Sequence, residues 1–328
     1  MKIRLMFVLS TLFVVLLPLP GLAESPASEG LDYPPIGVPM ELKKVTDRVY
    51  YVQGAAGIAT DNEGFISNAG FVVTGEGVVV FDALGSPSLA VELLKKIRSV
   101  TDQPVTSVVV SHYHADHIYG LQVFKALGAQ ILAPAGALAY LDSPAAEQRL
   151  EERRFSLDPW VNDKTSLVRP DRIIAQDTSF RLGEVDFHLS LLGAVHSDGD
   201  MSMFVEPDRV LFSGDIIFEG RIPFVGDADT RRWVQALDDL QTGGVTALIP
   251  GHGPAAADPD QALAQTRDYL HYLRQTMGEA VAEMQDFAEA YEAVDWSAYQ
   301  GLPAFDGANR RNAYQVYLSL EREEMAQE

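Results

Sequence analysis

Hydrophobic and polar residues alternate in two ways along the chain after residue 45, and the two patterns predict different elements. Short runs rich in β-branched residues and bounded by turn residues predict strands at 49–52, 70–74, 78–81, 105–111, 131–133, 172–175, 179–191, 201–205, 209–213 and 247–249. Apolar residues at helical spacing predict helices near 87–99, 118–127, 135–154 and 230–241. This order favours two sheets packed face to face with helices outside.

The pattern becomes helical after Gly253. Asp258-Pro259-Asp260-Gln261 combines an N-cap, a first-turn proline and a capping-box partner, and it predicts a helix that runs to about Tyr291. A second helix is expected from about Asn309 to Glu323. We therefore predict one catalytic domain over residues 41–255, followed by a C-terminal helical extension over residues 256–328.

Residues 1–23 are typical of a secretory signal peptide. A basic start precedes the apolar run Leu5–Leu17, and the small residue Ala23 stands at the expected cleavage point. The run is too short for the roughly 30 Å of a bilayer core, so no stable membrane anchor is expected. We expect a periplasmic or secreted protein in which residues 24–40, rich in Pro, Ser and Gly, form a loose leader.

Composition limits the chemistry and the partners. The chain of 328 residues has 46 Asp plus Glu against 25 Lys plus Arg, a net charge of −21, which disfavours binding to nucleic acid or to an anionic membrane surface. It has no cysteine. Disulfides, thiolate nucleophiles and Cys-ligated metal sites are therefore excluded, and any metal must be bound by nitrogen and oxygen ligands. The sequence gives no indication of the oligomeric state.

The most informative motif is a histidine-rich turn at the end of a predicted strand. Residues two apart in extended chain point the same way, so His112 and His114 are expected to present their imidazoles to one ion. Asp116 and His117 follow where the backbone turns, and they are expected to face a second ion. Imidazole and carboxylate are the ligands that zinc accepts when cysteine is absent.

Three further ligand candidates each follow an apolar strand: His196, Asp215 and His252. Each is a weak signal alone, but in this order after the histidine-rich turn they form a specific set. The remaining histidines, His188 and His271, lie on the polar faces of a strand and a helix and are expected to be solvated.

Together these motifs resemble those of the metallo-β-lactamase superfamily over about residues 41–254. The stretch from Ser67 to Asp82 also resembles the opening hairpin of that family. The resemblance implies an α/β fold, the αββα four-layer sandwich, with two zinc ions at one edge of the sheets. Its implied ligands are His112, His114 and His196 for the first ion, Asp116, His117 and His252 for the second, and Asp215 as the bridge, with Asp82 supporting ligands from behind.

Differences among known branches narrow the expected function. Dedicated β-lactamases usually have Cys or Ser at the position of Asp215, and diiron oxidoreductases of the superfamily typically have Glu at that of His114. Glyoxalase II adds a basic pocket that the acidic tail here lacks. The signal peptide and the tail at 309–314 resemble a periplasmic branch grouped with quinoprotein-associated zinc hydrolases.

We therefore predict a periplasmic dinuclear zinc hydrolase in which a metal-bridging hydroxide attacks a small ester, thioester or lactam, with Asp116 as the catalytic residue that orients it. A possible substrate pocket includes Tyr113, Tyr119, Arg221 and Phe224, although the two tyrosines are more typical of packing residues with solvated hydroxyls. Two alternatives remain at this point. One is a mononuclear iron dioxygenase of persulfides, and the other is a non-catalytic zinc-holding or partner-binding module.

Overall fold

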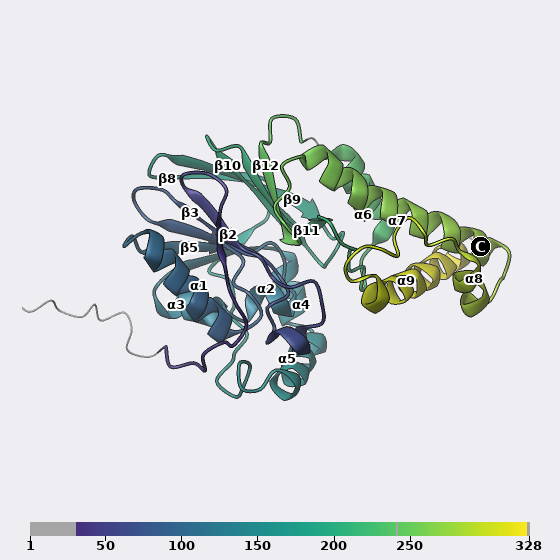
Figure 1. Ribbon diagram of the computed structural model, residues 1–328, viewed down its shortest axis with the longest axis horizontal. Coiled ribbons are helices and arrows are strands. Elements are labelled where there is room, and N and C mark those ends of the chain that lie inside the picture. Colours follow the sequence, from purple (N-terminus) through teal and green to yellow (C-terminus); the bar gives the residue numbers. More distant parts are fainter. Residues whose placement is uncertain (1–30, 241, 327–328) are drawn as a thin grey trace, which may run out of the picture. The chain divides into compact units, whose positions relative to one another are not determined.

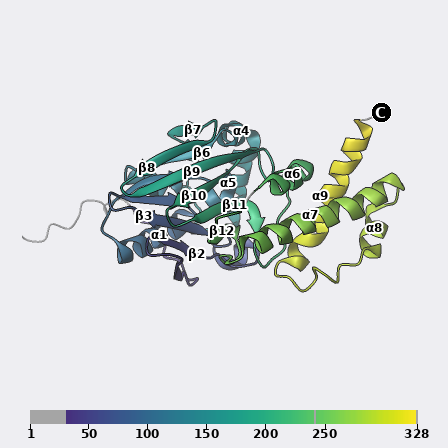
Figure 2. The same ribbon diagram turned by 90° about the horizontal axis from the view of Figure 1, so that it is seen from above.

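Two β-sheets, one of seven strands and one of five, form the centre of the chain (Figures 1 and 2). The computed structural model describes residues 31–240 and 242–326, and the account below concerns the unit that begins at Tyr33. The predicted signal peptide lies outside the described residues.

The first sheet joins an antiparallel meander to a set of parallel strands. Its strands, in spatial order, are β1 (Leu42–Lys44), β2 (Val49–Val52), β3 (Ala69–Val73), β4 (Val78–Phe81), β5 (Val105–Val109), β6 (Gln130–Pro134) and β7 (Arg172–Ile174). Its helices are α1 (Pro87–Val100), α2 (Ala115–Ile118), α3 (Leu121–Ala126), α4 (Gly136–Leu141) and α5 (Pro144–Ser156), with a short 3₁₀ helix, η2 (Ala59–Asn62). The histidine-rich turn leads from β5 into α2.

The second sheet is antiparallel except for the parallel pair of β11 and β12. Its strands are β8 (Thr178–Leu182), β9 (Val185–Gly193), β10 (Asp200–Glu206), β11 (Val210–Phe218) and β12 (Ala247–His252). The helix α6 (Thr230–Asp239) connects β11 to β12.

The space between the sheets is a hydrophobic core. Phe81 of the first sheet and Phe212 of the second stack with ring centroids 5.1 Å apart. Gly70 allows this approach, because a Cβ at that position would lie 2.3 Å from the Phe212 ring. Helices flank the two sheets, so the predicted αββα sandwich is confirmed.

Two helices expected in the first half are each divided. The helix expected over 135–154 is α4 and α5, since Pro144 lacks an N–H and disfavours helical backbone at Ser143 before it. The helix expected over 118–127 begins earlier, as α2, and is interrupted at Gly120 before α3. Gly120 lies so close to Ala83 that a Cβ would meet its carbonyl oxygen at 1.9 Å.

The C-terminal region consists of α7 (Pro259–Ala282), α8 (Phe287–Ala293) and α9 (Phe305–Met325). The expected N-cap is present, because the Asp258 side chain accepts from the Gln261 amide. The expectation of one helix to Tyr291 is wrong: Met284 has a φ of 54°, and Asp286 starts a new helix by capping it. No helix in the described part of the chain is long and apolar enough to cross a membrane.

The C-terminal helices share a hydrophobic core with the second sheet. Buried Phe218 of β11 and Trp233 of α6 belong to the same cluster as Leu273 of α7 and Val316 of α9. Both views show α7 and α9 side by side next to the sandwich. The region predicted as an extension therefore packs directly on the sheet that carries Asp215.

The described part of the predicted leader contacts the sandwich. Residues 33–40 form no helix or strand, but the Tyr33 hydroxyl accepts from Gln122 at 2.6 Å and the Pro35 carbonyl accepts from the Trp160 indole at 3.1 Å. This segment is thus attached to the fold rather than loose.

Candidate metal centre

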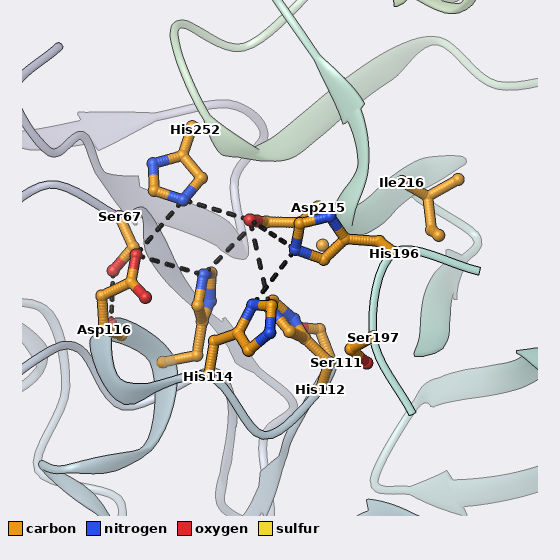
Figure 3. Close-up of polar contacts among 12 residues, drawn as sticks. Ser67, Ser111, His112, His114, Asp116, His196, Ser197, Asp215, Ile216 and His252 are labelled. Carbon is orange, nitrogen blue, oxygen red and sulfur yellow. Dashed lines mark hydrogen bonds and ion pairs between the residues drawn. The ribbon is translucent and has the colours of Figure 1, made fainter. Parts of the chain in front are cut away.

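All the residues predicted as metal ligands meet at one edge of the two sheets. Figure 3 shows the side chains of His112, His114, Asp116, His196, Asp215 and His252 turned toward one another. In each of three groups of residues, the ligand atoms lie within 4.8 Å of one another. The groups are His112–His114–His196, His112–His117–Asp215 and Asp116–His117–His252, so His112 and His117 each belong to two groups.

The Asp215 carboxylate lies between the other ligands. Its Oδ1 is 3.3 Å from Nε2 of His117, whereas its Oδ2 is 3.4 Å from Nε2 of His196 and 3.2 Å from Nε2 of His252. One carboxylate therefore faces both outer groups, which is the geometry required of a bridging ligand.

The position of Asp215 in its strand differs from the expectation. It was expected after the end of a strand at residue 213, but β11 continues to Phe218. Gly214 has a φ of 55°, and the pairing of β11 with β12 shifts register on both sides of it. This irregularity turns the Asp215 side chain into the edge cluster while the strand continues.

Three imidazole nitrogens converge in the first group. Nδ1 of His114 lies 2.9 Å from Nε2 of His112 and 3.2 Å from Nε2 of His196. Lone pairs that meet at such distances repel unless a proton or a cation lies between them. This donor set fits a zinc ion.

Three buried atoms of the ligand residues also lack a hydrogen-bond partner among the residues the structure describes: Nε2 of His117, Oδ1 of Asp215 and Nδ1 of His196. Buried polar atoms without a partner are rare. The first two lie 3.3 Å from each other inside the cluster. The residues present therefore fit two metal ions that share Asp215.

The outer nitrogens of several histidines are held by acceptors behind the site. Asp82 accepts from Nδ1 of His117 at 2.9 Å and from the Ser111 hydroxyl at 2.8 Å, and Ser111 in turn is 2.9 Å from Nδ1 of His112. Nδ1 of His252 donates to the Ile66 carbonyl at 2.7 Å. These contacts direct each Nε2 into the cluster and raise its basicity. Asp82 thus occupies the supporting position expected for it.

Three supporting residues were not predicted to have such a role. Ser111 relays the contact between Asp82 and His112. Asn68 donates from Nδ2 to the carbonyls of Pro250 and Gly253, both at 2.8 Å, and so holds the loop that carries His252. Asp200 accepts the amides of residues 195, 196 and 197 and holds the loop that carries His196. The signal for Asp200 was an acidic residue just after a ligand, which is typical of a side chain that caps a turn.

The ligand histidines form two sets, according to whether their pKa is lowered or raised. Burial lowers the pKa of His112 and lowers that of His196 to about 3. Burial acts in the same direction on His117 and His252, but the charges of Asp215 and Asp116 outweigh it and raise the pKa of both. Protons therefore bind beside the carboxylates when no metal is present.

The predicted pocket residues have different environments. Tyr113 is buried and its hydroxyl donates to the Val168 carbonyl at 2.9 Å. Tyr119 is also buried, beside a cavity of about 10 Å³ that holds no more than one water. The expectation that both tyrosines are packing residues is therefore confirmed, whereas the expectation that their hydroxyls are solvated is wrong. Arg221 is buried with its guanidinium carbon 5.9 Å from the centroid of the Phe218 ring, and Phe224 is half-buried in the same loop.

The two remaining histidines lie outside the cluster. His188 is partly exposed and contacts Ser179 at 2.8 Å and Glu206 at 3.0 Å. His271 is exposed on α7. Both positions agree with the expectation from their polar faces.

Comparison with known sequences identifies the class. The model of the metallo-β-lactamase superfamily matches residues 62–252, more than half of the chain. The chain belongs to this superfamily of metal-dependent hydrolases. The fold and the enzyme class expected from the motifs are thereby confirmed.

Similar proteins are distant in sequence. The chain is 25% identical to a metallo-β-lactamase type 2 of Elizabethkingia meningoseptica, over 57% of this chain and 69% of that protein. It is 22% identical to a β-lactamase-like protein 2 homolog of Caenorhabditis elegans, over 68% of this chain and 67% of that one.

Two solved structures share the fold. A metallo-β-lactamase from Pontibacter korlensis aligns with a TM-score of 0.56 at 22% identity, over 71% of this chain and 99% of its own. The inverting sec-alkylsulfatase Pisa1 from a Pseudomonas species aligns with a TM-score of 0.68 at 18% identity, over 85% of this chain and 50% of its own.

Proposed function

We propose that the protein is a periplasmic or secreted hydrolase that binds two zinc ions and cleaves a small ester, thioester or lactam. The observation that carries this proposal is the Asp215 carboxylate, whose oxygens face His117 on one side and His196 and His252 on the other. His112, His114 and His196 would hold one ion and Asp116, His117 and His252 the other. Two zinc ions held there would lower the pKa of a bound water from 15.7 toward about 7 and would act as a Lewis acid on the substrate.

Asp116 is the ligand best placed to accept a hydrogen bond from that water. Its side chain is 21% exposed, against 4% for Asp215, so it lies on the open side of the cluster. Its Oδ2 is 3.3 Å from Nε2 of His252, and its backbone carbonyl accepts from Ser67 at 2.5 Å. Burial raises the pKa of Asp116, but the charges of His117 and His252 hold it below the ordinary range. An ionised Asp116 would accept a hydrogen bond from that water and so orient it toward the substrate.

Two arguments from the sequence support the location and the branch. The signal-peptide pattern at residues 1–23 supports export, and the tail at 309–314 resembles the quinoprotein-associated branch. An acyl substrate is proposed because a curated relative is a β-lactamase by name. The carboxylate at position 215 favours a broader acyl hydrolase over a dedicated β-lactamase.

Elemental analysis and a substrate panel on the purified mature protein test the proposal. We expect about two zinc ions per chain and hydrolysis of at least one chromogenic ester, thioester or lactam, with aryl phosphate and aryl sulfate as comparison substrates. One iron per chain and oxygen consumption with persulfide would favour the dioxygenase instead. A zinc-loaded protein inactive on the whole panel would contradict the proposed acyl specificity.

A further inference from the structure

Arg221 is a buried cation without a carboxylate partner. Arg221 is 7% exposed, and the one hydrogen bond of its guanidinium among the described residues is from Nε to the Ile222 carbonyl at 3.3 Å. It forms no ion pair within residues 31–240 and 242–326. Buried arginines are almost always paired, so the two terminal nitrogens of this guanidinium are available to an anion.

The guanidinium lies beside the metal centre. The Phe218 ring stacks on the imidazole of His252, with centroids 5.4 Å apart and planes within 3°. The guanidinium carbon of Arg221 is 5.9 Å from the centroid of the same Phe218 ring. Burial lowers the pKa of Arg221 while the charges of Asp215 and Asp116 oppose this, which places the cation within the field of the cluster. One aromatic ring therefore separates Arg221 from a ligand.

Asn312 of α9 fastens the loop that carries Arg221, residues 219–226. Its Oδ1 accepts from the Val225 amide at 3.0 Å and its Nδ2 donates to the Pro223 carbonyl at 2.7 Å. The same Nδ2 also donates to the Tyr269 hydroxyl at 3.0 Å. Asn312 is fully buried, so these hydrogen bonds are shielded from water and fix both backbone and side chain.

Other contacts from the C-terminal region reinforce this loop. The Ile222 amide donates to the Pro303 carbonyl at 3.0 Å, and Gln265 of α7 donates to the Arg221 carbonyl at 3.4 Å. The guanidinium of Arg311 lies 5.3 Å from the centroid of the Phe224 ring. The backbone on which Arg221 stands is thus held mainly by α7, α9 and the segment between them.

We propose that Arg221 binds an anionic oxygen group of the substrate and that Asn312 is a positioning residue for Arg221. The C-terminal helices would then determine the preference for anionic substrates, in addition to completing the core. A guanidinium fork matches a carboxylate or a sulfate in a bidentate way. The inference rests on the proposed metal centre, because the reacting part of the same substrate would lie there.

Binding of two small thiols to the zinc-loaded protein tests this without requiring turnover. Thiolate is a zinc ligand, so 3-mercaptopropionate and 1-propanethiol are both expected to bind, but only the first has a carboxylate for Arg221. We expect wild type to bind 3-mercaptopropionate at least about tenfold more tightly. Arg221→Gln should remove roughly 10- to 100-fold of its affinity and change that for 1-propanethiol by less than about twofold. Arg221→Lys should keep part of the preference.

The positioning role is tested by combining variants. Asn312→Ala should reduce the preference for 3-mercaptopropionate about 3- to 10-fold with unchanged zinc content. In the Arg221→Gln background it should have no further effect on that preference, because the two residues act through one contact. Gln265→Ala, at a half-buried position, provides a milder variant if Asn312→Ala fails to fold. Arg310→Gln is the matched control, since Arg310 of the same helix pairs with exposed Glu292.

The outcomes separate this inference from the proposed function. Equal affinity of wild type for both thiols, in a protein that holds two zinc ions and hydrolyses neutral esters, would overturn the role of Arg221 alone. A loss in Asn312→Ala that persists fully in the Arg221→Gln background would overturn the positioning role. Failure to bind zinc or either thiol would overturn the metal centre and this inference with it.

Discussion

The two outer ligand groups of the candidate centre differ in charge, although the Asp215 carboxylate lies between them. His112, His114 and His196, called here the imidazole group, contain no carboxylate. Asp116, His117 and His252, called here the mixed group, contain one and lie against the Asp215 oxygens. Burial alone dominates the first group, whereas ion pairing dominates the second. In the absence of metal, the histidines of the imidazole group are therefore expected to be neutral, whereas those of the mixed group bind protons.

This difference predicts an order of metal binding. A metal ligand must be deprotonated. The pKa of each imidazole-group histidine is lowered, so these side chains are free bases at neutral pH. The mixed group must release protons first. We therefore expect the imidazole group to hold its ion more firmly near neutral pH.

The largest expected effect is on turnover when either group loses a histidine. His196→Ala and His252→Ala should each lower kcat at least about 1,000-fold, since the proposed mechanism uses both ions to activate water and polarise the substrate. Zinc content should fall by about one ion per chain in His252→Ala. It should fall by more than one in His196→Ala, because His196 belongs to the imidazole group, which is expected to bind its ion more tightly. Elemental analysis and turnover on one preparation check this. His188→Ala, on a partly exposed strand position, is the control and should resemble wild type.

Removal of the supporting carboxylate should have a smaller effect that reaches both groups. Asp82 contacts His117 directly and reaches His112 through Ser111. We expect Asp82→Asn to weaken zinc binding roughly 10- to 100-fold, measured by competition with a chelator. Asp47→Asn, at an exposed position in the turn between β1 and β2, is the matched control. Unchanged affinity in Asp82→Asn would show that the outer hydrogen bonds do not tune the ligands.

A modest effect is expected on proton release. The pKa values of His117 and His252 lie above the ordinary 6.5, so both hold protons just above that pH and zinc must displace them. The second zinc equivalent should therefore bind more tightly as pH rises from about 6.5 to 8, until the pH passes the raised pKa values. The pKa values of His112 and His196 lie below 6.5, so the first equivalent should change little over this range. Calorimetry in buffers of different ionisation enthalpy counts the protons, and equal release by both equivalents would remove the distinction.

Local sequence was sufficient to place the residues of the histidine-rich turn. His112 and His114 follow from the period of extended chain, and the start of a helix separates Asp116 and His117 from them. The division of the helix at Ser143-Pro144 could also have been predicted from local sequence, because proline restricts the backbone of the residue before it. These features depend only on neighbouring residues.

Features that depend on distant contacts could not be predicted in this way. Gly214 adopts its positive φ where a Cβ would lie 2.6 Å from the Ser111 side chain, so the irregularity that places Asp215 depends on packing between the sheets. The role of Asn312 requires knowing that α9 lies against the loop at 219–226. The pattern of apolar and polar residues along the chain does not show which distant loop a buried polar residue such as Asn312 will hold.

The most direct test of the central claim is the zinc content and turnover of Asp215→Ala, measured on one preparation. Two dications about 3.5–4 Å apart repel, and an anion between them offsets much of this repulsion. The account predicts a folded variant that keeps about one zinc ion, held by the imidazole group, and loses at least about 99% of its hydrolytic rate. A variant that still bound two zinc ions and hydrolysed its best substrate at the wild-type rate would contradict the bridging role of Asp215 and the dinuclear centre built on it.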